Sequence, residues 1–265
     1  MNFSMIRKAT MAVAVGAALS AGSAIAAPVF TVNTGSIPGA VNKTFDADFI
    51  SGFSSELLHL TGNTATGSGW VQFTSFKNGA AAVLPGTSRL GVDYQLYLTF
   101  SLSDTLVAGT AGTAGAVYQL DTLTFNVWAD AALDTTFTNA NVTGAVEATV
   151  SQGTADIDLG SGTLIVGTAG FNALGGVFQN AIATFTLTPD GKNYFVSPDP
   201  FYTVAFDEFN NTTQGLAFSP DGSLAAITNA SGGVDFNKVP EPASLSLLGL
   251  GLVGLGALSR KRKAA

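Results

Sequence analysis

The feature that most constrains the fold of this chain is the alternation of apolar and polar residues along short runs. A period of two places successive side chains on opposite faces of a β-strand. The clearest runs are residues 94–100 and 123–128. Further candidate strands cover residues 44–49, 70–76, 181–188, 202–206 and 215–218. The middle of the chain is therefore predicted to consist mainly of strands.

Turn residues separate these candidate strands. Proline and glycine clusters stand at residues 85–86, 189–191, 197–200 and 220–222, and Asn210-Asn211 marks another turn. Because proline lacks a backbone N–H and glycine disfavours regular structure, this spacing leaves little room for long helices. Many short strands with frequent turns predict an all-β fold. We expect a β-sandwich, and a jelly roll is one form that it could take. The Gly/Ala/Thr-rich residues 107–116 are expected to form a loop.

The first 26 residues have the order of a secretory signal peptide. Arg7 and Lys8 precede an uncharged, small and apolar run over residues 9–21. Ala24, Ala26 and Ala27 surround the expected cleavage site, which lies between residues 26 and 27. The alternative is a buried N-terminal helix, but a core helix would carry an interleaved polar face that this run lacks.

Residues 240–265 form a second segment with three parts. Pro240, Glu241 and Pro242 are followed by a charge-free apolar stretch over residues 243–258. This stretch is slightly shorter than the ~20 residues that span a bilayer comfortably. Four basic residues then follow it: Arg260, Lys261, Arg262 and Lys263. Because basic clusters stay cytoplasmic, we expect a single membrane helix with the central region outside the inner membrane.

This three-part tail resembles the PEP-CTERM sorting signal of Gram-negative bacteria. The resemblance implies that exosortase, a membrane-embedded cysteine transpeptidase, recognises Pro240, Glu241 and Pro242 and processes the chain near them. It also implies release or transfer of the protein to the cell surface or extracellular matrix. A plain single-span anchor is the alternative. Between the two ends we expect one all-β extracellular domain over residues 27–228 and a short linker over residues 229–239.

The central region is acidic and contains no cysteine. Six of the 11 basic residues belong to the two ends, whereas all 18 acidic residues lie between residues 27 and 242. An acidic body repels nucleic acid at long range, so nucleic acid is not expected as a partner. Without cysteine, neither a disulfide nor a thiolate nucleophile is available. Stability must therefore come from packing.

Candidate catalytic residues are few, and none is expected to act. His59 is the only histidine and stands in a strand-like run without a Gly-x-Ser-x-Gly elbow, so we expect a half-exposed strand residue. Three pairs of neighbouring carboxylates are Asp46 with Asp48, Asp156 with Asp158, and Asp207 with Glu208. A polysaccharide hydrolase would need such a pair across a cleft. Nothing in the sequence marks a cleft, so solvated faces are expected.

Two binding roles remain open. The carboxylate pairs have the oxygen ligands that calcium prefers, but no EF-hand loop is present, so we predict no cofactor and keep calcium as an alternative. Exposed aromatic side chains could stack on sugars in a carbohydrate-binding module. Tyr194 and Tyr202, beside the proline-rich turn, are expected to be the most exposed.

The body of the chain resembles the flocculation-associated PEP-CTERM proteins of floc-forming bacteria. The matching segments are residues 48–52 followed by 54–56, then 69–73, 91–97, 201–209 and 233–236. The resemblance implies a non-enzymatic protein that associates cells with exopolysaccharide and promotes floc or biofilm formation. It brings no catalytic residues. The alternatives are a secreted carbohydrate-binding module and a polysaccharide-active hydrolase.

Overall fold

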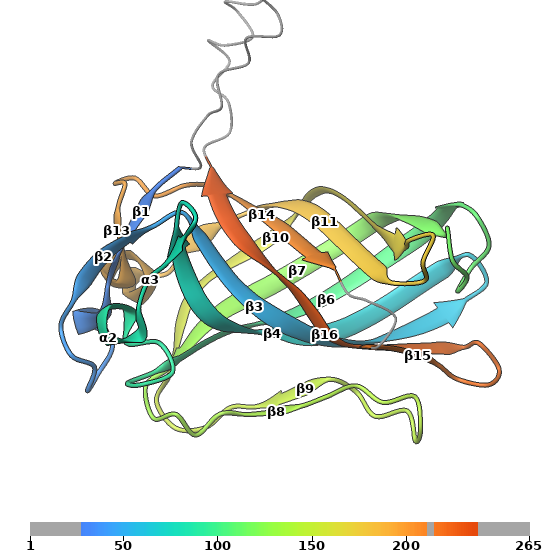
Figure 1. Cartoon of the computed structure of the whole chain (residues 1–265), viewed down its shortest axis with the longest axis horizontal. Helices are drawn as coiled ribbons and strands as arrows, with labels where there is room; N and C mark the ends of the chain where they lie inside the picture. The colour runs from blue at the N-terminus through green and yellow to red at the C-terminus, as the bar shows by residue number, and fades with distance from the viewer. Residues whose placement is uncertain (1–27, 211–214, 238–265) are drawn as a thin grey trace, which may run out of the picture.

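The structure is a computed structural model that describes residues 28–210 and 215–237. The expected signal peptide and the sorting tail lie outside the described residues. A closed ring of eight antiparallel strands forms the body (Figure 1). In ring order these are β3 (Phe49–Thr61), β4 (Thr64–Asn78), β6 (Gln95–Ala108), β7 (Val117–Asp130), β10 (Asp156–Phe171), β11 (Val177–Thr184), β14 (Val204–Asn210) and β16 (Leu224–Asn237). β16 pairs back onto β3, which completes the barrel.

The predicted all-β class is confirmed, but the expected β-sandwich differs from what the structure shows. A sandwich has two packed sheets, whereas here β10 pairs with β11 and one continuous sheet closes on itself. Alternation predicts one inward and one outward face for strands of either architecture. Closure depends instead on strand tilt and on the register between strands, which local patterning does not specify.

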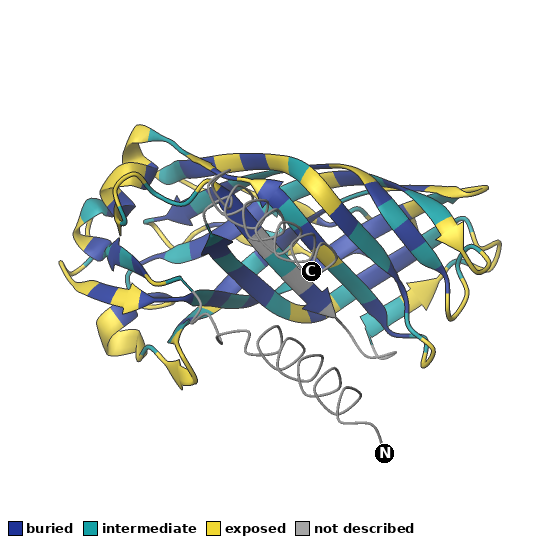
Figure 2. Ribbon diagram, turned by 90° about the horizontal axis from the view of Figure 1, so that it is seen from above, coloured by how far each residue is buried: buried dark blue, intermediate teal, exposed yellow. Residues whose placement is uncertain are grey.

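The inward face of each strand is apolar and the outward face is mostly polar, which Figure 2 shows as alternating burial along the strands. In β6, Leu98, Phe100 and Leu102 line the interior, whereas Ser101 and Thr99 face outward. Burying these apolar side chains inside the ring provides the main driving force for folding. The closed ring also leaves its described strands without a free edge.

Glycines inside the strands make room for aromatic rings of neighbouring strands. A Cβ on Gly162 in β10 would collide with the carbonyl oxygen of Thr184 and with the ring of Phe125. A Cβ on Gly69 in β4 would likewise collide with the ring of Phe100. Small residues opposite large ones allow a narrow barrel to fill its interior.

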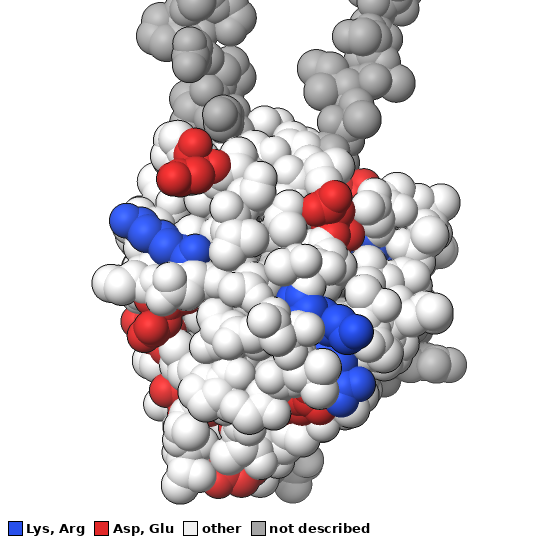
Figure 3. Space-filling model, turned by 90° about the vertical axis from the view of Figure 1, so that its left-hand side faces the viewer, with Lys and Arg blue, Asp and Glu red and all other residues white. Residues whose placement is uncertain are grey.

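A cap closes one end of the barrel. It contains the three-stranded sheet of β13 (Phe195–Ser197), β1 (Phe30–Asn33) and β2 (Thr44–Ala47). Three short helices accompany it: η1 (Thr34–Ser36), α2 (Pro85–Ser88) and α3 (Pro189–Tyr194). Phe30 packs edge-on against Phe195 and Phe236, so aromatic rings fill the space between cap and barrel. Figure 3 looks onto this end and shows Lys and Arg beside Asp and Glu on a mostly uncharged surface.

A hairpin arm lies along the outside of the barrel (Figure 1). It contains β8 (Thr136–Thr138) and β9 (Thr149–Ser151). The indole of Trp70 on β4 donates a hydrogen bond of 2.9 Å to the carbonyl of Thr138. The arm therefore covers an apolar patch on the outer face that would otherwise be exposed. The remaining short strands are β5 (Ala81–Ala82), β12 (Thr186–Leu187) and β15 (Leu216–Phe218), which extend the main sheet.

Two boundaries differ from those expected. Residues 229–237, expected within the linker over 229–239, form the second half of β16 and pair with both β3 and β14. Their Ser/Gly-rich composition suggested a tether, yet Val234 and Phe236 face the interior and close the ring. The expected loop over residues 107–116 begins two residues later, after Ala108.

The close approach at Gly162 predicts a destabilised variant. Gly162→Ala is expected to lower the free energy of unfolding by about 1–3 kcal/mol, because the new methyl group collides with backbone and an aromatic ring. Gly86→Ala is the matched control, since a Cβ there meets nothing within 4 Å. Denaturant unfolding of both variants measures the difference. Equal stability of the two variants would contradict the packing described here.

Candidate binding site inside the barrel

The barrel encloses a cavity of about 90 Å³. All eight ring strands contribute to its lining, which consists mainly of Leu, Val, Phe and Ala side chains. A buried water molecule needs roughly 10–15 Å³ of such space, so the cavity admits several waters or a small, narrow ligand. The interior is therefore a site that a molecule can occupy.

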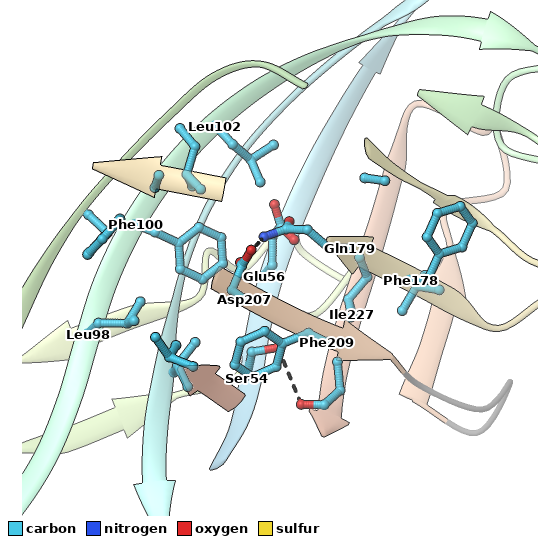
Figure 4. Close-up of a pocket in the computed structure, with 18 of the residues that line it drawn as sticks. Ser54, Glu56, Leu98, Phe100, Leu102, Phe178, Gln179, Asp207, Phe209 and Ile227 are labelled. Carbon is cyan, nitrogen blue, oxygen red and sulfur yellow. Dashed lines mark hydrogen bonds between the residues drawn. The ribbon is translucent and has the colours of Figure 1, made fainter. Parts of the chain in front are cut away.

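Three carboxyl groups belong to this apolar lining. Glu56 comes from β3, Asp104 from β6 and Asp207 from β14. Glu56 is 7% exposed and Asp104 is 3% exposed. Figure 4 shows Glu56 and Asp207 pointing into the same interior space, with the Gln179 side chain beside them. The closed ring thus brings together acids that lie far apart in the sequence.

These carboxyls have few partners. Gln179 Nε2 donates a hydrogen bond of 2.9 Å to Asp207 Oδ2. Glu56 Oε1, Asp104 Oδ1 and Asp207 Oδ1 are buried and have no hydrogen-bond partner among the described residues. In the same part of the chain, no Lys, Arg or His side chain lines the cavity. Buried carboxyl oxygens without donors are unfavourable, which is why they are rare.

Burial changes the protonation of all three groups. It raises the pKa of Glu56 to about 8, and repulsion from Asp104 adds to the effect. It raises the pKa of Asp104 to about 7, with a further contribution from Asp121. Burial raises the pKa of Asp207 to about 6, opposed by the hydrogen bond from Gln179. Near neutral pH the site therefore contains protonated carboxyl groups beside ionised ones.

Local sequence explains how Glu56 fits among apolar neighbours. Gly67 lies on the adjacent strand β4, and a Cβ there would stand 2.5 Å from Glu56 Oε1. The glycine therefore leaves the space that the Glu56 carboxyl occupies. At Asp104 the register between β6 and β7 shifts, and Asp104 pairs with Leu120. This irregularity leaves Asp121 as an extra residue on β7, close enough to raise the pKa of Asp104.

Glu56 and Asp104 are not among the site residues predicted from the sequence. Each occupies an inward position of its strand, two residues from an inward leucine, so the alternation contains the necessary signal. In β3 this signal is weak, because Leu57 and Leu58 are both buried and only one of them faces the interior. Leu57 packs beneath the hairpin arm instead.

His59 lies on the outer face of β3, as expected for an exposed strand residue. Its Nε2 stands 2.8 Å from Glu147 Oε1 at the far end of the hairpin arm, and both side chains are exposed. The pair links the arm to the barrel. His59 does not line the interior cavity.

The structure does not bring the expected carboxylate pairs together in a cleft. Asp46 accepts a hydrogen bond from Thr31 Oγ1 and Asp48 accepts one from the Gly79 amide. Asp156 and Asp158 accept hydrogen bonds from Thr135 Oγ1 and the Gly160 amide. These four have local structural partners, whereas Asp207 faces the cavity. The side chain of Glu208 lies outside the described residues.

Neither predicted exposed tyrosine is freely exposed, and Tyr194 is the clear error. Thr188 caps α3, and the helix turns Tyr194 into the core, where its side chain is fully buried. The Tyr194 hydroxyl lies 2.7 Å from the Tyr94 hydroxyl. Tyr202 is half-buried and donates to the carbonyl of Val29. The short helix was not expected from the turn residues that begin it.

No group of three or more His, Asp or Glu side chains within residues 28–210 and 215–237 is placed to hold a metal ion. Across those same residues, no helix is long and apolar enough to span a membrane. The expected membrane helix over residues 243–258, the signal cleavage site and the basic cluster all lie outside the described residues.

Comparison with known proteins identifies one segment of the chain. A family model described as the PEP-CTERM protein-sorting motif matches residues 238–263. No curated protein and no solved structure matches the chain. The matched segment contains Pro240, Glu241 and Pro242 and the basic cluster, so the expected sorting motif is confirmed. It indicates an exported protein that exosortase processes and that reaches the cell envelope or surface.

The interior carboxyls predict that stability decreases as the pH rises. Glu56 in the unfolded chain loses its proton near the ordinary glutamate pKa of 4.5, whereas in the folded protein its pKa is about 8. Between these values the folded state binds the extra proton, so unfolding becomes more favourable by about 1.4 kcal/mol per pH unit. Glu56→Gln removes the contribution of Glu56 to the pH dependence of stability, whereas the contributions of Asp104 and Asp207 remain.

Thermal unfolding from about pH 5 to about pH 8 tests this expectation. The Glu56→Gln variant should lose less stability over this range than the wild type. Glu147→Gln is the matched control because Glu147 is exposed on the arm. If Glu56→Gln and Glu147→Gln follow the same pH profile, the buried position assigned to Glu56 is wrong.

Proposed function

We propose that this exported protein binds a small, mainly apolar ligand inside its barrel. The observation that supports the proposal most strongly is the enclosed apolar cavity with carboxyl oxygens that lack partners. Small-molecule sites are typically apolar cavities with a few convergent polar groups. Acids with raised pKa values in such a cavity also favour a functional site over a purely structural interior.

The ends of the barrel differ in a way that suits ligand entry. The cap and its aromatic cluster fill one end. At the other end, residues 109–116 form a loop in which the Gly112 amide donates a hydrogen bond of 3.1 Å to the Tyr118 hydroxyl. A loop opens at less cost than a packed sheet, because fewer buried contacts hold it. In this proposal the ligand enters beside that loop.

The proposed role is binding without catalysis. A hydrolase acting on polysaccharide needs two acids at a cleft that the chain can reach. Glu56 and Asp104 are instead almost completely buried inside a closed barrel. An enclosed site of this size suits a small molecule rather than a polymer.

Filling the cavity should weaken ligand binding. Ala183 on β11 lines the cavity and is 3% exposed, so Ala183→Leu is expected to weaken binding of 1-hexanol by about tenfold or more. Isothermal titration calorimetry measures the affinity. Ala82→Leu is the control, because Ala82 is exposed on β5. If Ala183→Leu disturbs folding, Ala205→Val makes a smaller change in the same lining. No binding by the wild type, or equal binding by filled and control variants, would exclude the interior site.

A second proposed role follows from the outer face. Two rows of uncharged polar residues cross β6, β7, β10 and the strands paired with β10. One row contains Thr99, Asn126, Ser161 and Thr186, and the other contains Ser101, Thr124, Thr163 and Thr184. We name these eight residues the hydroxyl face. Hydroxyl groups donate and accept hydrogen bonds, as sugar hydroxyls do, and many weak contacts give useful avidity.

We propose that this face contacts exopolysaccharide in the extracellular matrix of a Gram-negative bacterium. In this role the protein associates cells with the matrix and promotes floc or biofilm formation. The resemblance to flocculation-associated proteins supports the role, and the sorting motif at residues 238–263 supports the location. A single-site carbohydrate-binding module would differ by saturable binding to one defined glycan.

Deletion of the gene tests the matrix role. We expect dispersed cells with undiminished total exopolysaccharide, measured together with floc settling. Restoring the wild-type gene should restore flocs, whereas a variant combining Ser101→Ala, Thr124→Val and Thr163→Val should not. The control combines Thr87→Val and Thr143→Val, two exposed positions away from the hydroxyl face. Unchanged flocs after deletion would reject this role.

A further inference from the structure

The interior carboxyls form an acidic site, and no positively charged side chain among the described residues lines it. Glu56 and Asp104 are each more than nine-tenths buried, and each has an oxygen without a hydrogen-bond partner among the described residues. Both line the cavity. Four described residues of the domain, Lys43, Lys77, Arg89 and Lys192, carry permanent positive charge, and none of them lines the cavity. The missing partner of these carboxyls is therefore a donor that a ligand could bring.

We propose that the cavity binds an apolar amine, whose ammonium group lies between Glu56 and Asp104. The inference rests on the proposed interior binding site and names the chemical class of its ligand. An ammonium group donates up to three hydrogen bonds, and charge-assisted bonds to carboxylates are stronger than neutral ones. A neutral alcohol can donate only one. An anionic ligand would meet repulsion from those carboxyls that are ionised.

The surroundings of the carboxyls suit an apolar body attached to the amine. Figure 4 shows Leu98, Phe100 and Phe209 around the same interior space as Glu56. Leu58 and Leu102 line the cavity beside the two acids. A small alkyl or aryl group would therefore lie against aliphatic and aromatic side chains while its amine reaches the carboxyls.

Binding of an amine should release protons from the site. Without a bound amine, Glu56 is mostly protonated near neutral pH and Asp104 is partly protonated, because burial raises their pKa values. An ammonium group favours the ionised carboxylates, so one or both protons leave when it binds. Two other titratable groups line this site, Asp207 on β14 and the Tyr118 hydroxyl on β7. Asp121 is exposed outside the lining and raises the pKa of Asp104 by charge repulsion. β4, β10, β11 and β16 contribute no titratable side chain to the lining.

Three probes with the same alkyl chain test the head group: hexylamine, 1-hexanol and hexanoate. Calorimetry of the full domain near neutral pH should give about tenfold tighter binding of hexylamine than of 1-hexanol, and hexanoate should bind most weakly. Repeating the hexylamine titration in buffers of different ionisation enthalpy should reveal proton release. Affinity for hexylamine should decrease as the pH falls, whereas affinity for 1-hexanol should change little.

Substitutions locate the ammonium site. Glu56→Gln and Asp104→Asn should each weaken hexylamine binding by about tenfold and leave 1-hexanol within about threefold. Glu147→Gln, at an exposed acid outside the barrel, should change neither. Ala183→Leu should block hexylamine, which separates interior binding from attraction to the acidic surface.

The outcomes distinguish this inference from the proposed function. Equal affinity for hexylamine and 1-hexanol would overturn the amine inference and leave interior binding in place. The same holds if hexylamine binding survives Ala183→Leu while 1-hexanol binding is lost. Absence of binding by every probe would overturn the interior binding function and the amine inference with it. Preference for hexylamine that depends on Glu56 and Asp104 would support both.

Discussion

The pairing of β10 with β11 is the interaction on which the rest of the structure depends. It connects β10 to β11 within one continuous sheet, so that β16 can pair with β3 and the closed sheet encloses an interior. In an open sheet, an inward side chain meets only its neighbours on adjacent strands. In a closed ring it also meets side chains from across the interior. This is why Glu56, Asp104 and Asp207, separated by many residues in the sequence, share one cavity.

Closure also determines where large and small residues must stand. A narrow ring cannot hold an aromatic side chain at every inward position, so Gly69 accompanies Phe100 and Gly162 accompanies Phe125. At the cap, the aromatic rings of Phe30, Phe195 and Phe236 pack against one another. Along the interior the filling is incomplete, and the polar groups of Glu56, Asp104 and Asp207 enter the lining of the cavity. The cavity is thus the region where apolar packing is incomplete and polar side chains are present.

The sequence predicts the strands and the C-terminal sorting motif well. It predicts the residues that line the barrel interior less well. The alternation in residues 94–100 is strong enough to identify β6, and Pro240-Glu241-Pro242 with its basic cluster is specific enough to identify the sorting motif. Ring closure could not be predicted, because it depends on register between distant strands. Glu56 was missed because Leu57 is also buried, beneath an arm contributed by residues far along the chain. Tyr194 was misjudged because a short helix, α3, directs its side chain into the core.

The interior acids lower the stability of the folded state, and the rest of the barrel has to offset that loss. Each buried carboxylate without a donor disfavours folding at neutral and higher pH. A molecule that brings a donor to these oxygens binds only the folded protein, so its binding energy adds directly to the free energy of unfolding. Occupancy of the cavity and stability of the barrel are therefore coupled. For an exported protein without disulfides, such a ligand would replace part of the stabilisation that cross-links provide in other extracellular domains.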